Sequence, residues 1–321
     1  MNVSLILVDL DGPSADWQAN IRSAVDVTAR RLYVYFEGKQ AHDAPDEGLL
    51  ALLARYYNEV ADLKPQLDLI PLLPFASWSL DRVAMLSDVQ AVLGACRVGK
   101  SRQLAQDLNY RRAGELQPLL LHPLGPDKDP PSRDQNSGDT PSDPTEPTSA
   151  VQTAAVKGPL LFSNTAVGGT FDRLHAGHRI LLTATALVTT TMVYVGVTSD
   201  LLLQHKEHAE LLQSYDERRD AAVKFIQAVR PELRVQTAAL RDPQEPTGAA
   251  TMPEMEAIVV SKETVKGAHD INLWRQEHGS TPLTVVTVDL VGRQGSSTAN
   301  KLSSTRLRME AAQRLGSNAT P

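Results

Sequence analysis

Short apolar runs alternate with stretches of helical spacing in the first part of the chain. Apolar runs predict strands at 3–8, 32–36 and, more weakly, 88–93. Apolar residues spaced by three and four predict helices at 17–31 and 49–63. These elements predict a small α/β unit.

The second part alternates more regularly. Strands are predicted at 161–167, 192–197, 233–237, 257–260 and 283–288. Helices are predicted at 177–188, 215–229, 264–277 and 304–315. Such alternation indicates a Rossmann-like parallel sheet with right-handed crossovers. In such sheets ligands bind beyond the carboxyl ends of the strands.

A change in composition separates the two parts. Residues 123–147 contain seven of the 20 prolines, mixed with Asp, Ser, Thr and Gly, and no aromatic residue occurs between Tyr110 and Phe162. Such a segment buries too little apolar surface to offset its conformational entropy. We predict a disordered linker at 125–157, an N-terminal α/β domain at 1–124 and a second domain at 158–321.

Composition narrows the class of protein. The formal net charge of −6 argues against a general nucleic-acid binder. Cys96 is the only cysteine, so no intrachain disulfide or cysteine-based zinc site is expected. The N-terminal apolar run is too short for a membrane span and lacks the basic flank of a signal peptide. These features predict a cytoplasmic protein without membrane or nucleic-acid partners.

Residues 167–178, VGGTFDRLHAGH, lead from a predicted strand into a predicted helix. Glycines here allow backbone N–H groups to approach an anion, and the start of the helix directs a positive dipole at the same point. His175 and His178 are three residues apart and can share one side of the first turn. Two histidines alone would more often be ordinary surface residues, but the whole segment predicts a triphosphate site.

A second candidate segment is KLSSTRLR at 301–308, where three hydroxyl side chains open the last predicted helix. Hydroxyls at a helix start can cap the helix or bind phosphate oxygens. Alone this segment indicates only a helix cap. Its occurrence together with the first segment makes it a candidate phosphate site.

The two segments together resemble the paired signature of the HxGH nucleotidyltransferases. Further strings occur in the order found in eukaryotic-type phosphopantetheine adenylyltransferases and in bifunctional coenzyme A synthases: VGVTSDLLL followed by Lys206, SYDERR, LRDPQEPTG and IVVSKETVKGAHDINLWR. The resemblance covers about 162–315. The N-terminal part resembles that family only in size and general pattern.

The resemblance implies residue roles. His178 would stabilise charge on the ATP phosphates, with His175 beside it, and Lys206 would hold the phosphoryl groups. Nucleotide-binding residues implied by the match are Gly168, Gly169, Thr170, Phe171, Asp172, Gly177, Arg275, Ser303, Ser304, Thr305 and Arg308. Independently of the resemblance, Ser214 and Glu217 can form a capping box at the start of SYDERR.

The implied reaction transfers the adenylyl group of ATP to 4′-phosphopantetheine, giving dephospho-coenzyme A and pyrophosphate. Mg²⁺ is expected as a cofactor held mainly by the nucleotide, with no protein metal site. Expected partners are the two substrates and other coenzyme A pathway enzymes, including a separate dephospho-coenzyme A kinase. Alternatives are a cytidylyltransferase, a nicotinamide mononucleotide adenylyltransferase, or a scaffold that only holds nucleotide.

Residues 94–101, GACRVGKS, match the P-loop pattern G-x-x-x-x-G-K-[ST]. The segment that follows supplies no apolar strand ending in a magnesium-binding Asp before the predicted linker. We therefore expect Lys100 not to bind ATP. The opening VDLDGP likewise resembles an aspartyl-phosphate phosphatase only superficially, because Pro13 stands where Thr or Val is needed.

Overall fold

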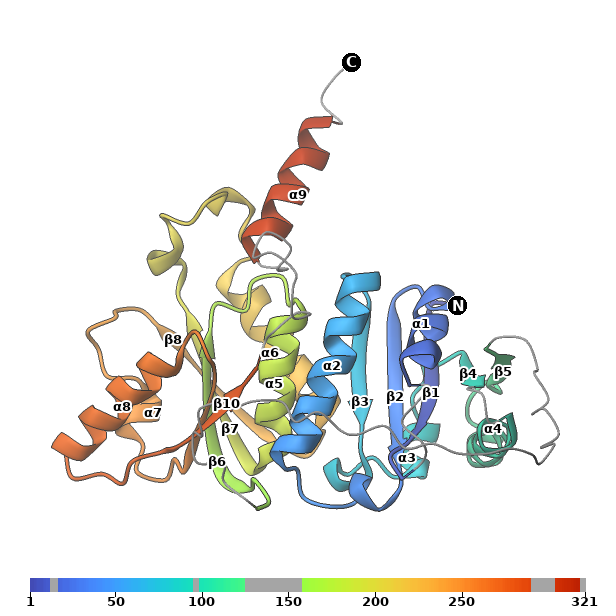
Figure 1. The fold of residues 1–321 in the computed structure, drawn as a ribbon. Helices are drawn as coiled ribbons and strands as arrows, with labels where there is room; N and C mark the ends of the chain where they lie inside the picture. Colours follow the sequence, from blue (N-terminus) through green and yellow to red (C-terminus); the bar gives the residue numbers. More distant parts are fainter. Residues whose placement is uncertain (12–16, 95–97, 125–157, 290–303, 318–321) are drawn as a thin grey trace, which may run out of the picture.

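The computed structural model describes residues 1–11, 17–94, 98–124, 158–289 and 304–317. Within this part of the chain, two five-stranded sheets form, and every strand pair in them is parallel. Figure 1 shows the two sheets on opposite sides of a central layer of helices. The α/β class with parallel sheets is confirmed, whereas the predicted linker at 125–157 lies outside the described residues.

The first sheet has the strand order β3-β2-β1-β4-β5. Its strands are β1 (Val3–Asp9), β2 (Arg31–Glu37), β3 (Asp68–Leu72), β4 (Ala91–Gly94) and β5 (Leu120–Pro123). The helices are α1 (Trp17–Val27), α2 (Glu47–Leu63), α3 (Leu80–Ala84) and α4 (Val98–Arg112). The two strands that the pattern did not predict, β3 and β5, lie at the edges and contain Pro71 and Pro123. Edge strands tolerate proline because its missing N–H can face away from the sheet.

The second sheet has the order β10-β9-β6-β7-β8. Its strands are β6 (Phe162–Gly169), β7 (Thr189–Thr198), β8 (Arg234–Leu240), β9 (Ala257–Ser261) and β10 (Thr284–Val288). The helices are α5 (Ala176–Val188), α6 (Tyr215–Val229), α7 (Gly248–Thr251), α8 (Val265–Glu277) and α9 (Ser304–Ser317). The five predicted strands and four predicted helices are confirmed. From β6 the chain adds β7 and β8 on one side and then β9 and β10 on the other. The strand order therefore reverses at β6, and the carboxyl end of this strand is the expected ligand site.

Helix α5 is apolar on nearly every side. All nine residues from Ile180 to Val188 are buried, which is typical of a helix enclosed by other elements rather than one lying on a surface. It packs against α2 of the first half and α6 of the second, and α2 and α5 run side by side in Figure 1. The loop before α5 is therefore continuous with a helix that is packed on nearly every side.

The two halves share one hydrophobic core across this helix layer. The Tyr57 hydroxyl and Thr183 Oγ1 form a buried hydrogen bond of 2.7 Å between α2 and α5. Trp78 Nε1 donates to the Val229 carbonyl oxygen at 2.9 Å, also buried. Residues of the first half thus contribute directly to the packing that supports the second.

Candidate nucleotide site

The loop between β6 and α5 has an unusual backbone. Phe171 and Arg173 adopt positive φ angles of 55° and 47°, which cost free energy in residues other than glycine. The Phe171 ring is fully buried. A Cβ on Gly169 would lie 3.0–3.3 Å from that ring, so the loop needs glycine there for close packing rather than for a positive φ.

The two histidines lie together at the start of α5. His175 is the N-cap residue and His178 stands in the first turn. Their rings stack with centroids 4.0 Å apart, and the His178 ring lies 5.5 Å from the Phe171 ring. Burial, and then the charges of His175 and Arg179, lower the pKa of His178 well below its ordinary value. His178 is therefore neutral at pH 7, and its Nδ1 has no hydrogen-bond partner among the described residues.

Helix α9 is fastened directly to this loop. Arg308 Nη1 donates to Asp172 Oδ2 at 2.6 Å, and both side chains are buried. Ser304 Oγ donates to the Asp172 carbonyl oxygen at 2.8 Å. The structure thus brings the two candidate segments together, although they are more than 120 residues apart in sequence.

Lys206 and Thr305 lie beside the same contact. Arg308 Nε donates to the Glu207 carbonyl oxygen at 3.0 Å, so the backbone next to Lys206 is held against α9. The Lys206 side chain is exposed. Thr305 Oγ1 accepts from Arg308 Nη2 at 3.2 Å. Ser303 lies outside the described residues. Gly168 is the last residue but one of β6, Thr170 follows the strand directly, and Gly177 lies in the first turn of α5.

Arg218 ties the carboxyl ends of β6 and β7 together. Its buried guanidinium donates to the carbonyl oxygens of Thr170 at 2.7 Å and Thr198 at 2.8 Å, and pairs with Asp200 at 2.6 Å. Sequence reasoning missed this role, although it singled out the SYDERR string that contains Arg218. The predicted capping box of Ser214 and Glu217 in that string is confirmed.

The side chains of four residues that were expected to contact the nucleotide make other contacts instead. Arg275 is fully buried and its guanidinium donates to five backbone carbonyl oxygens, those of Ala249, Ala250, Met252, Met255 and Thr281. It therefore fastens α8 to the 249–255 segment and does not present a charge to phosphate. Asp172 and Arg308 neutralise one another, and Phe171 packs beneath the loop. These side chains shape the loop from within.

Comparison with known proteins agrees with this geometry. The sequence family described as Cytidylyltransferase-like matches residues 166–310. The phosphopantetheine adenylyltransferase of Saccharomyces cerevisiae is 44% identical over 148 residues, which are 46% of this chain and 48% of the yeast protein. The enzyme of the same name from Thermococcus kodakarensis is 38% identical, and the match covers 44% of this chain and 82% of that protein. The one from Pyrococcus abyssi is 36% identical, and the match covers 46% of this chain and 90% of that protein.

The fold, the glycine–histidine loop and the match over 166–310 place the second half in the cytidylyltransferase-like class of nucleotidyltransferases. Within that class, the chain belongs to the phosphopantetheine adenylyltransferase family. The resemblance inferred from the motifs is thereby confirmed. The chain spans about half the length of the yeast relative that it matches.

Proposed function

We propose that this protein transfers the adenylyl group of ATP to 4′-phosphopantetheine, giving dephospho-coenzyme A and pyrophosphate. The observation that carries the proposal is the joining of the histidine loop to α9 through Asp172, Arg308 and Ser304. That joint holds the start of α9 against the loop that carries His175 and His178, which supports a phosphate site shared by the two segments. Family membership supplies the identity of the acceptor. Residues 158–321 are proposed as the adenylyltransferase domain.

The chemistry requires little from the protein beyond position and charge. A phosphate oxygen of phosphopantetheine attacks the α-phosphorus of ATP, the bond to the bridging oxygen breaks, and pyrophosphate leaves. The nucleophile is already an anion at neutral pH, so no general base is needed. Neutral His178 would donate a hydrogen bond to an α-phosphate oxygen as negative charge grows there. His175, Lys206 and Thr305 would hold the other phosphate oxygens. Ser304 gives its only hydroxyl proton to the Asp172 carbonyl oxygen and would instead position the start of α9.

No group of three or more His, Cys, Asp or Glu side chains within the described ranges could hold a metal ion. We propose that Mg²⁺ accompanies the phosphates of ATP, for which it needs few protein ligands. No described helix is both long and apolar enough to span a membrane. Action in the cytoplasm, beside a separate dephospho-coenzyme A kinase, is part of the same proposal.

Acceptor and nucleotide choice tests the proposal against its relatives in the class. Pyrophosphate release should be measured with ATP and CTP, each with 4′-phosphopantetheine, nicotinamide mononucleotide or phosphocholine as acceptor. We expect release only with ATP and phosphopantetheine. Faster release with either other acceptor would assign the chain a different nucleotidyl transfer. Nucleotide binding without release for any pair would indicate a scaffold.

A further inference from the structure

A cleft of about 540 Å³ opens at the junction of the two halves. This volume lies within the usual range for small-molecule sites, roughly 300–1,000 Å³. Its walls come from the starts of β2 and β3, the β6–α5 loop, α6 and the first turn of α9. Neither His175 nor His178 is among the described residues that line it, although Arg173 and Leu174 are, so this cleft borders the nucleotide loop without including the histidine pair.

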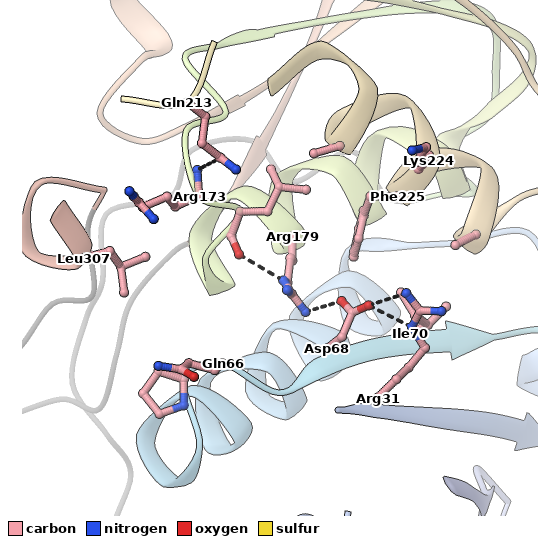
Figure 2. A pocket seen from close by; sticks show the side chains of 14 residues that line it. Arg31, Gln66, Asp68, Ile70, Arg173, Arg179, Gln213, Lys224, Phe225 and Leu307 are labelled. Atoms are coloured by element: carbon pink, nitrogen blue, oxygen red, sulfur yellow. Dashed lines mark hydrogen bonds and ion pairs between the residues drawn. The ribbon is translucent and has the colours of Figure 1, made fainter. Parts of the chain in front are cut away.

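The cleft carries a surplus of positive charge. Arg31, Arg173, Arg179 and Lys224 line it, against a single carboxylate in its described lining, Asp68 (Figure 2). Four cations from four different elements converge on one solvent-open space, although like charges repel there. Such an arrangement favours an anionic ligand, since the ligand would relieve that repulsion.

Asp88, outside the lining, pairs with Arg31 at 3.1 Å. Within the lining, Asp68 neutralises a further part of this charge. It accepts from Arg31 Nε at 2.8 Å and also forms an ion pair with Arg179, as Figure 2 shows.

The Arg173 charge acts on the carboxylate of Glu217, whose pKa it helps to lower. Arg173 Nη2 donates to the Leu211 carbonyl oxygen at 2.8 Å. Its buried Nε has no partner among the described residues. Lys224 is exposed and has no ion pair within the described part of the chain. Among the described residues, Lys224 therefore retains an unmatched charge, and Arg173 retains a donor without an acceptor.

The remaining wall is partly apolar, with the polar side chains of Gln66 and Gln213 also part of it. Ile70, Leu174, Phe225 and Ala228 line the cleft between the cations. Protein atoms already cover Ile70 and Phe225 almost completely, whereas Leu174 and Ala228 are only half-buried. An organic phosphate would cover these two side chains, and an inorganic anion would not. The lining thus matches a molecule with a phosphate group and an apolar portion.

We propose that this junction cleft is a second ligand site, which binds a small phosphorylated molecule with an apolar portion. Arg173 and Arg179 flank the histidine pair along the chain, so an occupant would contact the residues on both sides of His175 and His178. The first half of the protein, through Asp68 and Arg31, would then contribute to ligand sensing at the second. Binding itself does not depend on the proposed adenylyl transfer.

The test is calorimetric titration of the full chain with inorganic pyrophosphate in the absence of Mg²⁺. Under the proposed function pyrophosphate also binds the nucleotide loop, so wild type should show two classes of site. Lys224→Glu should lose the cleft class or weaken it by about tenfold or more, and Lys224→Arg should retain it. Lys266→Glu, the same change at an exposed lysine of α8, should match wild type.

The outcomes separate this proposal from the proposed function. If wild type shows a single class of pyrophosphate site and Lys224→Glu shows none, the cleft proposal stands and pyrophosphate binding at the nucleotide loop is contradicted. Equal site numbers and affinities in Lys224→Glu and wild type would overturn the cleft proposal. Binding that is seen only after residues 125–157 are replaced by a Gly–Ser linker would also overturn the cleft proposal, because the chain itself would then be the occupant. For the apolar portion, n-hexyl phosphate should bind the cleft more tightly than inorganic phosphate, and equal affinity would contradict it.

Discussion

Arg308 and Asp172 form a 2.6 Å ion pair with exposed side-chain fractions of 2% and 0%, respectively. The pair joins helix α9 to the turn between β6 and α5, and it has no alternative contact with water. A charge left alone in such a place costs far more than the loss of a surface pair. The attachment of α9 therefore depends on both partners being present.

Asp172→Asn should destabilise the protein by about 3–5 kcal/mol, because it leaves the Arg308 charge buried without a counterion. Asp216→Asn is a matched control. It breaks an Arg219 pair of the same 2.6 Å length in which Asp216 is 73% exposed, and should cost at most about 1 kcal/mol. Urea unfolding of both variants gives the comparison. Equal losses would mean that the buried pair does not fasten α9.

Gly248→Ala tests the packing of α7 on the second sheet. An added Cβ would lie 2.4–2.6 Å from the Tyr194 ring, whose hydroxyl also accepts from Gly248 N at 3.1 Å. The overlap should cost about 1–3 kcal/mol. Gly267→Ala in α8 meets nothing within 4 Å and should stabilise by about 0.5–1 kcal/mol. A stabilised Gly248→Ala variant would show that α7 does not approach Tyr194 in this way.

The pKa of His178 predicts a pH-dependent contribution to stability. The pKa is lowered in the folded protein, chiefly by burial, so between about pH 7 and pH 5 the unfolded chain gains a proton that the native site does not. The free energy of unfolding should therefore decrease as the pH is lowered, by up to about 1.4 kcal/mol per pH unit from this residue alone. His178→Gln should lack that component, whereas His269→Gln, at an exposed position of α8, should retain it. Parallel pH profiles for wild type and His178→Gln would contradict the lowered pKa.

Lys100 tests whether the P-loop resemblance has any role. Its Nζ pairs with Asp9 and Glu37, each at 2.8 Å, at the carboxyl edge of the first sheet. Lys100→Ala should therefore change stability by no more than about 1 kcal/mol and leave ATP affinity unchanged. Equilibrium binding of ATP to the folded variant provides the measurement. Lost ATP binding would move the nucleotide site to the first half.

The sequence pattern predicted the second half better than the first for physical reasons. Regular alternation and a capping box at Ser214 define elements locally, and the histidine loop is contiguous in sequence. In contrast, β3 carries Pro71 and was missed, and the junction pair of Tyr57 and Thr183 depends on tertiary packing that no local pattern records. Arg275 was misinterpreted because a buried arginine and a phosphate-binding arginine look the same in sequence.

Loss of turnover without loss of fold is the expected effect of removing the His178 imidazole. Removing one such preorganised donor typically costs on the order of a hundred- to a thousandfold in turnover. His178→Ala should show that loss while ATP affinity changes little, because the loop amides and the α9 hydroxyls remain. His269→Ala should behave as wild type. Near-normal turnover in folded His178→Ala would remove the histidine from the mechanism.

The most direct measurement follows the label of α-³²P-ATP incubated with the full chain and 4′-phosphopantetheine. The account predicts that the label appears in dephospho-coenzyme A, with one pyrophosphate released for each labelled product. If the folded protein leaves the label in ATP, or transfers it to nicotinamide mononucleotide instead, the proposed adenylyl transfer to phosphopantetheine is wrong.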